Sequence, residues 1–283
     1  MFDRKSSIVS LSLVFYVALF FAGSARAVTC LGEYSADDST LRLWHFNDGS
    51  GTTALDDTGS GYDGKLQGTP LPTWATGRFG GGLHLTRAGS NGVNLDYFVP
   101  NDKPYLTESV TNFTLEMNFK WDYAYVSFLG YLFSLSDTAF ARIQLVEHGL
   151  APATYQIEYS ARRDDGAWPS IFTPADSTLD TNWHHLAFTR SWDGVNTGYK
   201  VYVDGVEKAS GSYAQGFWDS HIESYIGSAG SSNSVGGAID EVRFSNFVRT
   251  SFQNDWGHRK GDINQDCYVD FEDVAEFAAD WLK

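Results

Sequence analysis

The chain is poor in the residues that mark several common classes of protein. Its 283 residues include 2 cysteines, 2 methionines and 7 prolines, and 20 Lys and Arg stand against 35 Asp and Glu. The resulting net charge of −15 disfavours nucleic acid and anionic membranes as partners, because contacts to phosphate groups need Lys and Arg. The same acidic balance suits divalent cations and neutral partners.

Long apolar runs are missing except near the start of the chain. Arg4 and Lys5 precede an apolar stretch over residues 8–22, and Ala25-Arg26-Ala27 places small residues where a signal peptidase reads them. The stretch is short for a membrane span, which needs ~20 apolar residues, although an uncleaved anchor is the alternative. We expect residues 1–27 to be a secretory signal peptide, the mature chain to lack a membrane span, and the protein to be secreted, extracellular or periplasmic.

The scarcity of cysteine limits the covalent bonds that the exported chain can form. Cys30 and Cys267 lie near the two ends of the mature chain, and domains commonly bring their ends together. Cysteines can pair in an oxidising compartment. A Cys30–Cys267 disulfide bond and two separate thiols are both open at this level.

Helical periodicity is missing from residues 31 to 257, where short alternating runs of apolar and polar residues recur between turn signals. This pattern is typical of strands in a β-sandwich or barrel. Aromatic residues make up 16% of the chain and glycine contributes 28 residues, which fits strands joined by tight turns. Asp204-Gly205 between two such runs predicts a hairpin. The clearest runs are Leu41–Phe46, Phe113–Phe119, Trp183–Thr189, Tyr199–Val203 and Ile239–Phe244.

Four segments of this region together resemble a known family. They are Leu43–Phe46 with the Asp- and Gly-rich residues 48–61, Gly77–Leu85, Asn182–Ala187 with Val201–Gly205, and Gly237–Phe244. Their order and spacing resemble a laminin-G-like, pentraxin-like jelly roll of the concanavalin A-like lectin/glucanase superfamily. The resemblance implies an all-β fold, a two-sheet antiparallel jelly-roll β-sandwich over residues 28–257.

The same resemblance implies a calcium ion between the N-terminal Asp-Gly loop and the last strand. The matching residues are Asp48 and Asp240, with Asp57 as a further candidate. Asp240 falls in an apolar-patterned strand, where a bare carboxylate is costly unless it is paired or bound. The alternative is that these aspartates form turns, which Asp-Gly neighbours favour.

Residues 258–283 form a second predicted unit, an EF-hand-like calcium loop followed by a short helix. Oxygen-bearing residues recur at the spacing of EF-hand ligands. The predicted ligands are Asp262, Asn264, Asp266, Tyr268 through its carbonyl, Asp270 and Asp273. The sixth loop position is Cys267 where a sharp turn favours Gly, and the loop closes with Asp rather than Glu. The loop and helix resemble a single dockerin repeat.

The carboxylate pair of a glucanase is absent. Glucanases of the superfamily carry Glu-x-Asp-x-x-Glu on one strand, which places the acid and the nucleophile on the same face. No Glu in this chain is followed at the second position by Asp. His184 and His185 are adjacent on a predicted strand and therefore point to opposite faces. We expect no catalysis, with a polysaccharide hydrolase that uses another carboxylate pair as a less favoured alternative.

Aromatic rings near predicted loops and turns are the candidate ligand contacts. Sugars present apolar C–H faces to flat rings, and such sites add a few polar groups. Aromatic residues also fill sandwich cores, so each ring can instead be a core residue. These features favour a calcium-dependent, lectin-like carbohydrate-binding module, and an extracellular protein-interaction or anchoring module is the alternative. The candidate rings are Trp121, Tyr123, Tyr125, Trp168, Trp192 and Trp218.

Overall fold

The computed structural model describes most of the central region of the chain, which forms a compact unit over Glu33–Trp256. No helix in the described part is long and apolar enough to cross a membrane. Several predicted features lie outside the described residues. They are the signal peptide, both cysteines, and the C-terminal calcium loop with its helix, of which only Val274 is described. The described residues are 32–86, 92–94, 111–122, 130–135, 141–148, 154–163, 165–175, 180–214, 224–228, 234–250, 252 and 274.

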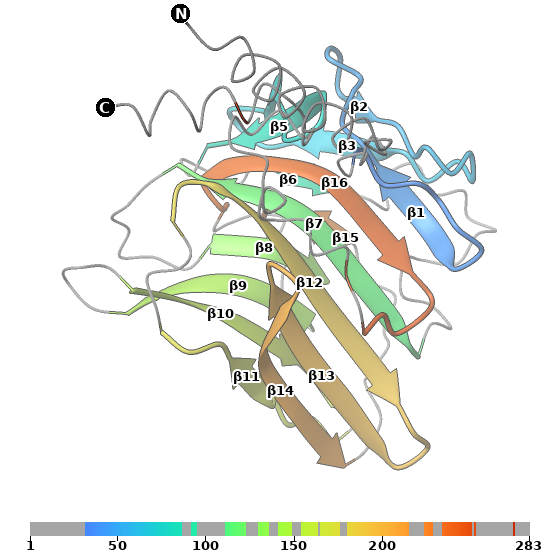
Figure 1. Ribbon diagram of the computed structural model, residues 1–283, viewed down its shortest axis with the longest axis vertical. Helices are drawn as coiled ribbons and strands as arrows, with labels where there is room; N and C mark the ends of the chain where they lie inside the picture. Colours follow the sequence, from blue (N-terminus) through green and yellow to red (C-terminus); the bar gives the residue numbers. More distant parts are fainter. Residues whose placement is uncertain are drawn as a thin grey trace, which may run out of the picture. The chain divides into compact units, whose positions relative to one another are not determined.

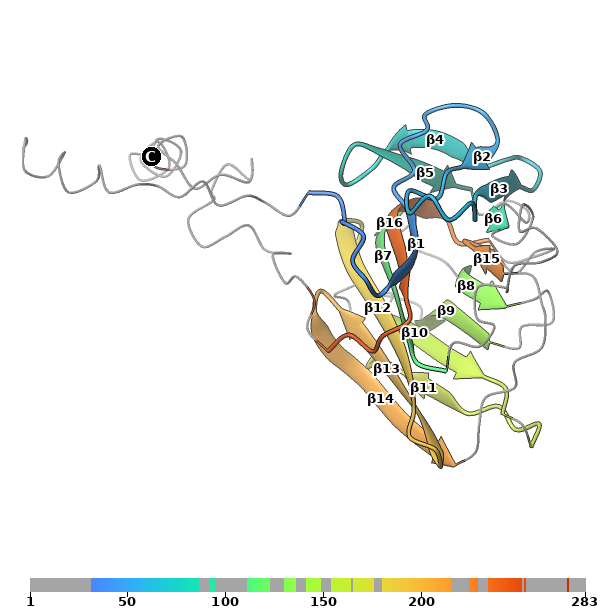
Figure 2. The ribbon, with the colours of Figure 1, turned by 90° about the vertical axis from the view of Figure 1, so that its right-hand side faces the viewer.

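Two antiparallel sheets form the two layers of the sandwich, which Figure 2 shows edge-on. The first sheet has β16 and β7 at its centre, and the shorter β1 and β5 both pair with β16. All of its strand pairs are antiparallel, which confirms this part of the predicted fold. In spatial order its strands are β14 (Val206–Ala214), β13 (Asn196–Val203), β12 (Trp183–Trp192), β7 (Phe113–Trp121), β16 (Gly237–Ser245), β5 (Gly81–Leu85) and β4 (Thr73–Thr76), with β1 (Thr40–Trp44) beside β16.

The second sheet is also antiparallel, and β11 forms one of its edges. Strands β8, β9, β10 and β11 follow one another down the view in Figure 1. In spatial order its strands are β11 (Ser170–Phe172), β10 (Thr154–Ala161), β9 (Ala141–His148), β8 (Gly130–Leu135), β15 (Ser224–Ile226), β6 (Gly92–Asn94), β3 (Gly64–Gln67) and β2 (Thr53–Ala54).

The alternation seen in the sequence sets the core between the sheets. Along β7 every second residue faces inward, and successive side chains of a strand point to opposite faces. The facing strands contribute further apolar side chains, so the core is continuous between the layers. The predicted hairpin at Asp204-Gly205 is also confirmed, because both residues have positive φ (50° and 73°) and join β13 to β14. The largest fully buried core side chains include Trp44, Phe188, Phe244, Leu83, Leu115, Met117 and Ile157.

The outer face of the first sheet is not open at its centre. Tyr34 packs edge-on against His185 with ring centroids 6.5 Å apart, and Phe252 lies 5.4 Å from the same imidazole. Below these rings Glu116 of β7 is buried and accepts hydrogen bonds from the Arg243 guanidinium of β16. Tyr34, which precedes β1, and Phe252, which follows β16, therefore cover this face around His185. The face offers no broad open surface around these residues.

Candidate functional site

The predicted calcium residues do not gather into a cluster of carboxylates. Among the residues that the structure describes, no group of three or more His, Cys, Asp and Glu side chains could hold a metal ion. Asp57 is exposed. Asp48 is half-buried, and burial together with the nearby Asp57 and Asp63 raises its pKa. These two aspartates therefore offer no assembled metal site by themselves.

Asp240 differs from the other two predicted ligands, because its side chain is fully buried. It lies at an irregularity of β16, where the next residue, Glu241, has a positive φ of 53°. The Oδ2 atom of Asp240 accepts a hydrogen bond from the Phe79 amide at 2.8 Å, and Oδ1 has no hydrogen-bond partner. Burial raises the pKa of Asp240 to about 7, although backbone amides including that of Phe79 act in the opposite direction. A buried carboxylate oxygen without a partner is costly.

The loop that contacts Asp240 is built for close approach. The amide of Gly77 donates to the carbonyl of Gly80 at 3.1 Å, and a Cβ added at Gly77 would lie 2.7 Å from Asp240 Oδ2. The side-chain oxygen of Asn47 accepts a hydrogen bond from the amide of Gly81 at 2.6 Å. Residues 77–79 thus approach the Asp240 carboxylate directly, and residues 46–47 contact the same loop at Gly80 and Gly81.

Trp121 is a core residue, which argues against its expected role as a ligand contact. Its side chain is only 8% exposed, with its ring 5.6 Å from Phe119 and 5.5 Å from Tyr155. It occupies the inward-facing register of β7, and this buries the indole against the second sheet. The candidate rings Tyr123 and Tyr125, which alternate with Trp121 in the sequence, lie outside the described residues, as does Trp218.

Two predicted rings lie nearer the surface, in different sheets. Trp192 ends β12 of the first sheet and is half-buried, and its amide donates to the side-chain oxygen of Asn112 at 2.8 Å. Trp168 is 42% exposed and lies just before β11 of the second sheet. Of the predicted aromatic contacts within the described residues, Trp168 exposes its ring most clearly.

A tight hairpin determines how Trp168 is presented. The Gly166 amide donates to the Arg163 carbonyl at 2.9 Å, and Gly166 has a φ of 81°. The Arg163 amide in turn donates to the Ala167 carbonyl at 2.9 Å, which closes a three-residue loop. This is the common hairpin in which a turn is followed by a left-handed glycine. Glycine fits there because a side chain would make the left-handed backbone unfavourable.

The hairpin keeps one register from the turn into β11. Ser160 pairs with Ser170 and Glu158 pairs with Phe172. Pairing continues beyond the strand, because the Ala161 amide donates to the Pro169 carbonyl at 3.4 Å. The same register sets Trp168 opposite Arg162. Directly opposite residues of an antiparallel pair share a face, and Ile171, which alternates with them, is in the core.

These three cross-strand pairs, Arg162–Trp168, Ser160–Ser170 and Glu158–Phe172, therefore line the outer face at the sheet edge, and we call them the edge ladder. Its two rings are the exposed ones, because Phe172 is 48% exposed and Trp168 is 42% exposed. Each ring has a polar residue opposite it and Ser170 lies between the two. The edge ladder thus combines flat apolar surfaces with hydrogen-bonding groups, as ligand sites commonly do.

A hydrogen-bond network fixes the polar part of the edge ladder. Glu158 is 6% exposed, and its Oε1 accepts hydrogen bonds from Ser170 Oγ at 2.9 Å and from the Arg142 guanidinium at 3.4 Å. Its Oε2 accepts a hydrogen bond from the side-chain amide of Gln144. Arg142 also donates through Nε to Ser160 Oγ at 3.0 Å. A network of this kind holds its side chains in fixed positions, because each buried polar group depends on the others for partners.

Strand β14 of the first sheet lies against the outer edge of β11. The Tyr213 hydroxyl donates to the Ser170 carbonyl at 3.1 Å. A Cβ added at Gly211 would lie 2.6 Å from Ile171 Cγ2, so the β14 backbone packs directly on β11. The backbone edge is therefore occupied at the Ser170 carbonyl, which hinders the addition of a further strand from a partner chain.

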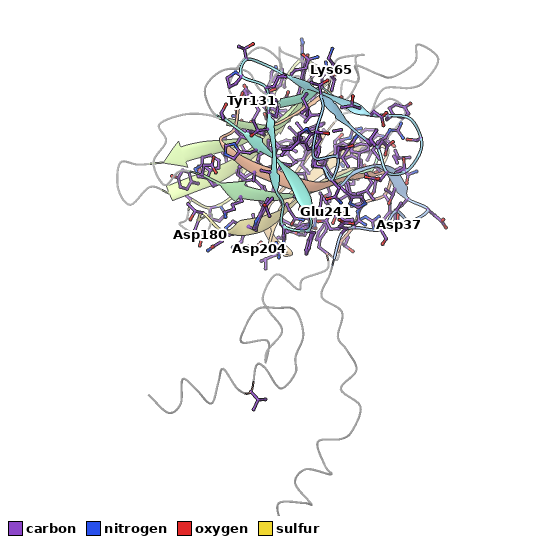
Figure 3. The ribbon with its side chains drawn as sticks, turned by 90° about the horizontal axis from the view of Figure 1, so that it is seen from above. Asp37, Lys65, Tyr131, Asp180, Asp204 and Glu241 are labelled. Carbon is purple, nitrogen blue, oxygen red and sulfur yellow. The ribbon has the colours of Figure 1, made fainter. Side chains whose placement is uncertain are left out.

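The adjacent histidines have separate structural partners. His184 is held between Asp204, whose Oδ2 lies 2.8 Å from Nδ1, and Asp180, whose Oδ1 lies 3.2 Å from Nε2. Figure 3 shows these two aspartates side by side. His185 instead faces Glu116, with Nε2 3.3 Å from Oε1. Both imidazoles thus have carboxylate partners, which are buried for His185 and partly exposed for His184.

Sequence reasoning missed most of the edge ladder. Phe172 and Glu158 were not singled out, because Phe172 lies in a strand of three residues and Glu158 in a strand of mixed character. A signal was present in the Gly166 turn and in the polar-aromatic alternation of Trp168, Ser170 and Phe172. That alternation marks a strand with one solvent-facing side.

The fold and the edge ladder define a class of protein, a two-sheet β-sandwich with exposed rings along one sheet edge. The comparisons identify the family within this class. Residues 90–253, more than half of the chain, match the model of the concanavalin A-like lectin/glucanases superfamily that carries the name Laminin_G_3. The chain therefore belongs to that superfamily. No curated protein sequence matches the chain.

Solved structures show the same fold at low sequence identity. Domain 4 of AbnA, an extracellular GH43 arabinanase from Geobacillus stearothermophilus in complex with arabinotriose, is 20% identical with a TM-score of 0.51, over 73% of this chain and 92% of that one. The receptor-binding domain of botulinum neurotoxin type G is 10% identical with a TM-score of 0.51, over 84% of this chain and 52% of that one. The Trypanosoma rangeli sialidase is 15% identical with a TM-score of 0.50, over 86% of this chain and 38% of that one.

Proposed function

We propose that the protein is a secreted, non-catalytic carbohydrate-binding module whose sugar contacts lie on the edge ladder. The observation that carries this proposal is the pair of exposed rings, Trp168 and Phe172, on either side of a fixed polar network. Pyranose and furanose rings present C–H faces to aromatic rings and hydroxyl groups to polar side chains. The similarity to a module of an extracellular arabinanase supports the secreted, carbohydrate-binding assignment.

The number of carboxylates in the edge ladder favours binding over hydrolysis. Most glycoside hydrolases need two carboxyl groups that flank the scissile bond. Within the described residues, Glu158 is the single carboxylate among the paired residues of the edge ladder, and its oxygens accept hydrogen bonds from Ser170, Arg142 and Gln144. Release of reducing sugar from a bound polysaccharide would contradict the non-catalytic assignment.

A sugar also fits the site better than a peptide strand does. Strand addition needs an open row of backbone groups at a sheet edge. Tyr213 of β14 occupies that row at the Ser170 carbonyl. The exposed part of the edge ladder consists of side chains, which suits contact with a glycan. A protein partner that competes with no glycan would favour the alternative of an extracellular interaction module.

Retention on a panel of soluble polysaccharides tests the proposal. The wild-type protein is expected to be retarded in native gels that contain one of them, and Trp168→Ala and Phe172→Ala should each weaken this affinity on the order of tenfold. Phe247→Ala is the matched control, because Phe247 is 59% exposed but follows β16 on the first sheet. Equal retention of all four proteins would overturn the assignment of the edge ladder.

We propose further that the module uses calcium at Asp240. The observation that supports it is the buried Oδ1 atom of Asp240, which has no hydrogen-bond partner and lies on a carboxylate that the loop at residues 77–79 approaches closely. Calcium accepts such oxygen ligands. Bound there, it would supply positive charge that offsets the cost of burying the Asp240 carboxylate. The loop 77–81 and β16 would then be held together.

Thermal melts with calcium and with chelator separate this site from the predicted loop near the C-terminus. Calcium bound to the folded state raises the melting temperature by mass action. Asp240→Asn should remove the part of the rise that comes from the sandwich, and Asp262→Asn the part that comes from the C-terminal loop. Asp38→Asn, an exposed aspartate, is the control. A full calcium response in Asp240→Asn would exclude calcium at Asp240.

A further inference from the structure

The exposed surface of the edge ladder is a strip that follows β11. Exposure falls steeply across the strands, from 48% for Phe172 of β11 to 6% for Glu158 of β10 and 1% for Gln144 of β9. These three residues lie in one cross-strand row. A ligand that crossed the sheet along this row would meet buried side chains, whereas in the next row Arg142 of β9 keeps 32% of its side chain exposed. The two exposed rings lie along β11, so their direction follows the strand.

The two rings lie at opposite ends of this strip. Trp168 and Phe172 are four residues apart in a segment that keeps a single strand register, so their backbone positions lie about 13 Å apart at ~3.3 Å per residue. This separation exceeds the width of a single sugar ring. Backbone positions this far apart suit contacts with two different sugar units.

The polar groups lie between the rings. Ser170 occupies the middle position of the strip, and its hydroxyl is fixed by Glu158 at 2.9 Å. Arg142 reaches this position from β9, and its side chain keeps 32% of its surface exposed. Hydrogen-bonding groups placed between two stacking platforms suit a sugar unit held within a chain.

We propose that the edge ladder recognises an internal segment of a linear polysaccharide that lies along β11. Different sugar units stack on Trp168 and on Phe172, and a unit between them contacts Ser170 and Arg142. This inference rests on the proposed carbohydrate-binding function and specifies its ligand class. The contacts proposed here, to Trp168, Phe172, Ser170 and Arg142, involve no terminal group of the polysaccharide, so recognition is expected to be independent of the chain ends.

Titration calorimetry with a size series of oligosaccharides, prepared from the polysaccharide that is retained best, tests this inference. Affinity is expected to rise with length until the oligosaccharide spans both rings and to stay constant beyond that length. Reduction of the reducing-end sugar should leave the affinity of the longer oligosaccharides unchanged. Phe172→Ala and Trp168→Ala should each weaken the affinity for the long oligosaccharides on the order of tenfold. With the shortest saccharide that binds, at most one of the two substitutions should reduce affinity.

The outcomes separate the inference from the function on which it rests. Two results would overturn the recognition of an internal segment while leaving carbohydrate binding in place. One is a monosaccharide that binds as tightly as the polymer, and the other is a loss of affinity when the reducing end is modified. Absence of binding to every glycan would overturn both. Melting temperatures of the two variants and of Phe247→Ala show that each protein is folded, because all three side chains are exposed.

Discussion

Arg243 of β16 donates two hydrogen bonds to Oε2 of Glu116 on β7, at 3.0 Å from Nε and 2.7 Å from the terminal nitrogen. Burial by itself would raise the pKa of Glu116, but the hydrogen bonds and positive charges of His185 and Arg243 lower it below its usual value. The carboxylate is therefore ionised inside the fold. The ion pair joins two neighbouring strands of the first sheet beneath Tyr34 and Phe252.

Removal of this buried carboxylate should strongly destabilise the protein. Glu116→Ala leaves Arg243 without its charged partner, and breaking a buried pair costs about 3 kcal/mol or more. Glu207→Ala is the matched control, because Glu207 pairs with Lys200 on the surface and both side chains are at least 40% exposed. Such exposed pairs contribute ~0.5 kcal/mol. Urea unfolding measures both values, and similar losses for the two variants would contradict the structural role of Glu116.

Asp240 should make the calcium-free protein lose stability as pH rises. Burial raises its pKa in the folded protein from 3.8 to about 7. Between these values the folded state holds a proton that the unfolded state has released, so the free energy of unfolding falls as pH increases. Asp240→Asn removes this dependence. Urea midpoints measured in chelator across this range should fall more steeply for wild type and for Asp38→Asn than for Asp240→Asn, and parallel curves would refute the prediction.

His184 should titrate above an ordinary histidine. Burial lowers its pKa, but the hydrogen bonds and negative charges of Asp204 and Asp180 outweigh burial and raise it above 6.5. A raised pKa contributes stability that is complete below 6.5 and is lost as pH rises through the folded-state value. An NMR titration of the imidazole proton measures it directly. Asp204→Asn should lower the pKa of His184, and Asp38→Asn should leave that pKa unchanged. An unchanged pKa in Asp204→Asn would refute the role of the Asp204 carboxylate in raising it.

The turn that presents Trp168 should be destabilised by a side chain at Gly166. Its φ of 81° is unfavourable for other residues, so Gly166→Ala should cost about 1 kcal/mol of stability through backbone strain. Space is not the obstacle, because the nearest atom to an added Cβ is 3.8 Å away. Gly32→Ala, at a site with open space and no left-handed backbone, is the control and should leave the urea midpoint unchanged. Equal stability of the two variants would mean that the turn adopts another conformation.

The site shows where sequence patterns stop being informative. Trp121 belongs to an alternating run, and alternation correctly groups residues that share a face of a strand. It does not say whether the face that Trp121 shares with Phe119 stays in the core at the end of the strand. The second sheet makes that choice, because Tyr155 packs on the Trp121 ring at 5.5 Å. Trp168 was easier to assign, because a Gly-containing turn precedes it and a turn lies at the surface.

The sequence by itself determined the all-β class, the main strands of the first sheet and the Asp204-Gly205 hairpin, because each depends on neighbouring residues and on period-two alternation. The tertiary structure alone decided which distant residues meet. Glu116 and Arg243 are 127 residues apart, and Arg142 meets Glu158 across a strand pair. Such contacts depend on sheet order and register, which bring residues together from strands that are remote in the chain. The edge ladder exists because β11 ends the second sheet, a property of the assembled fold that no local pattern records.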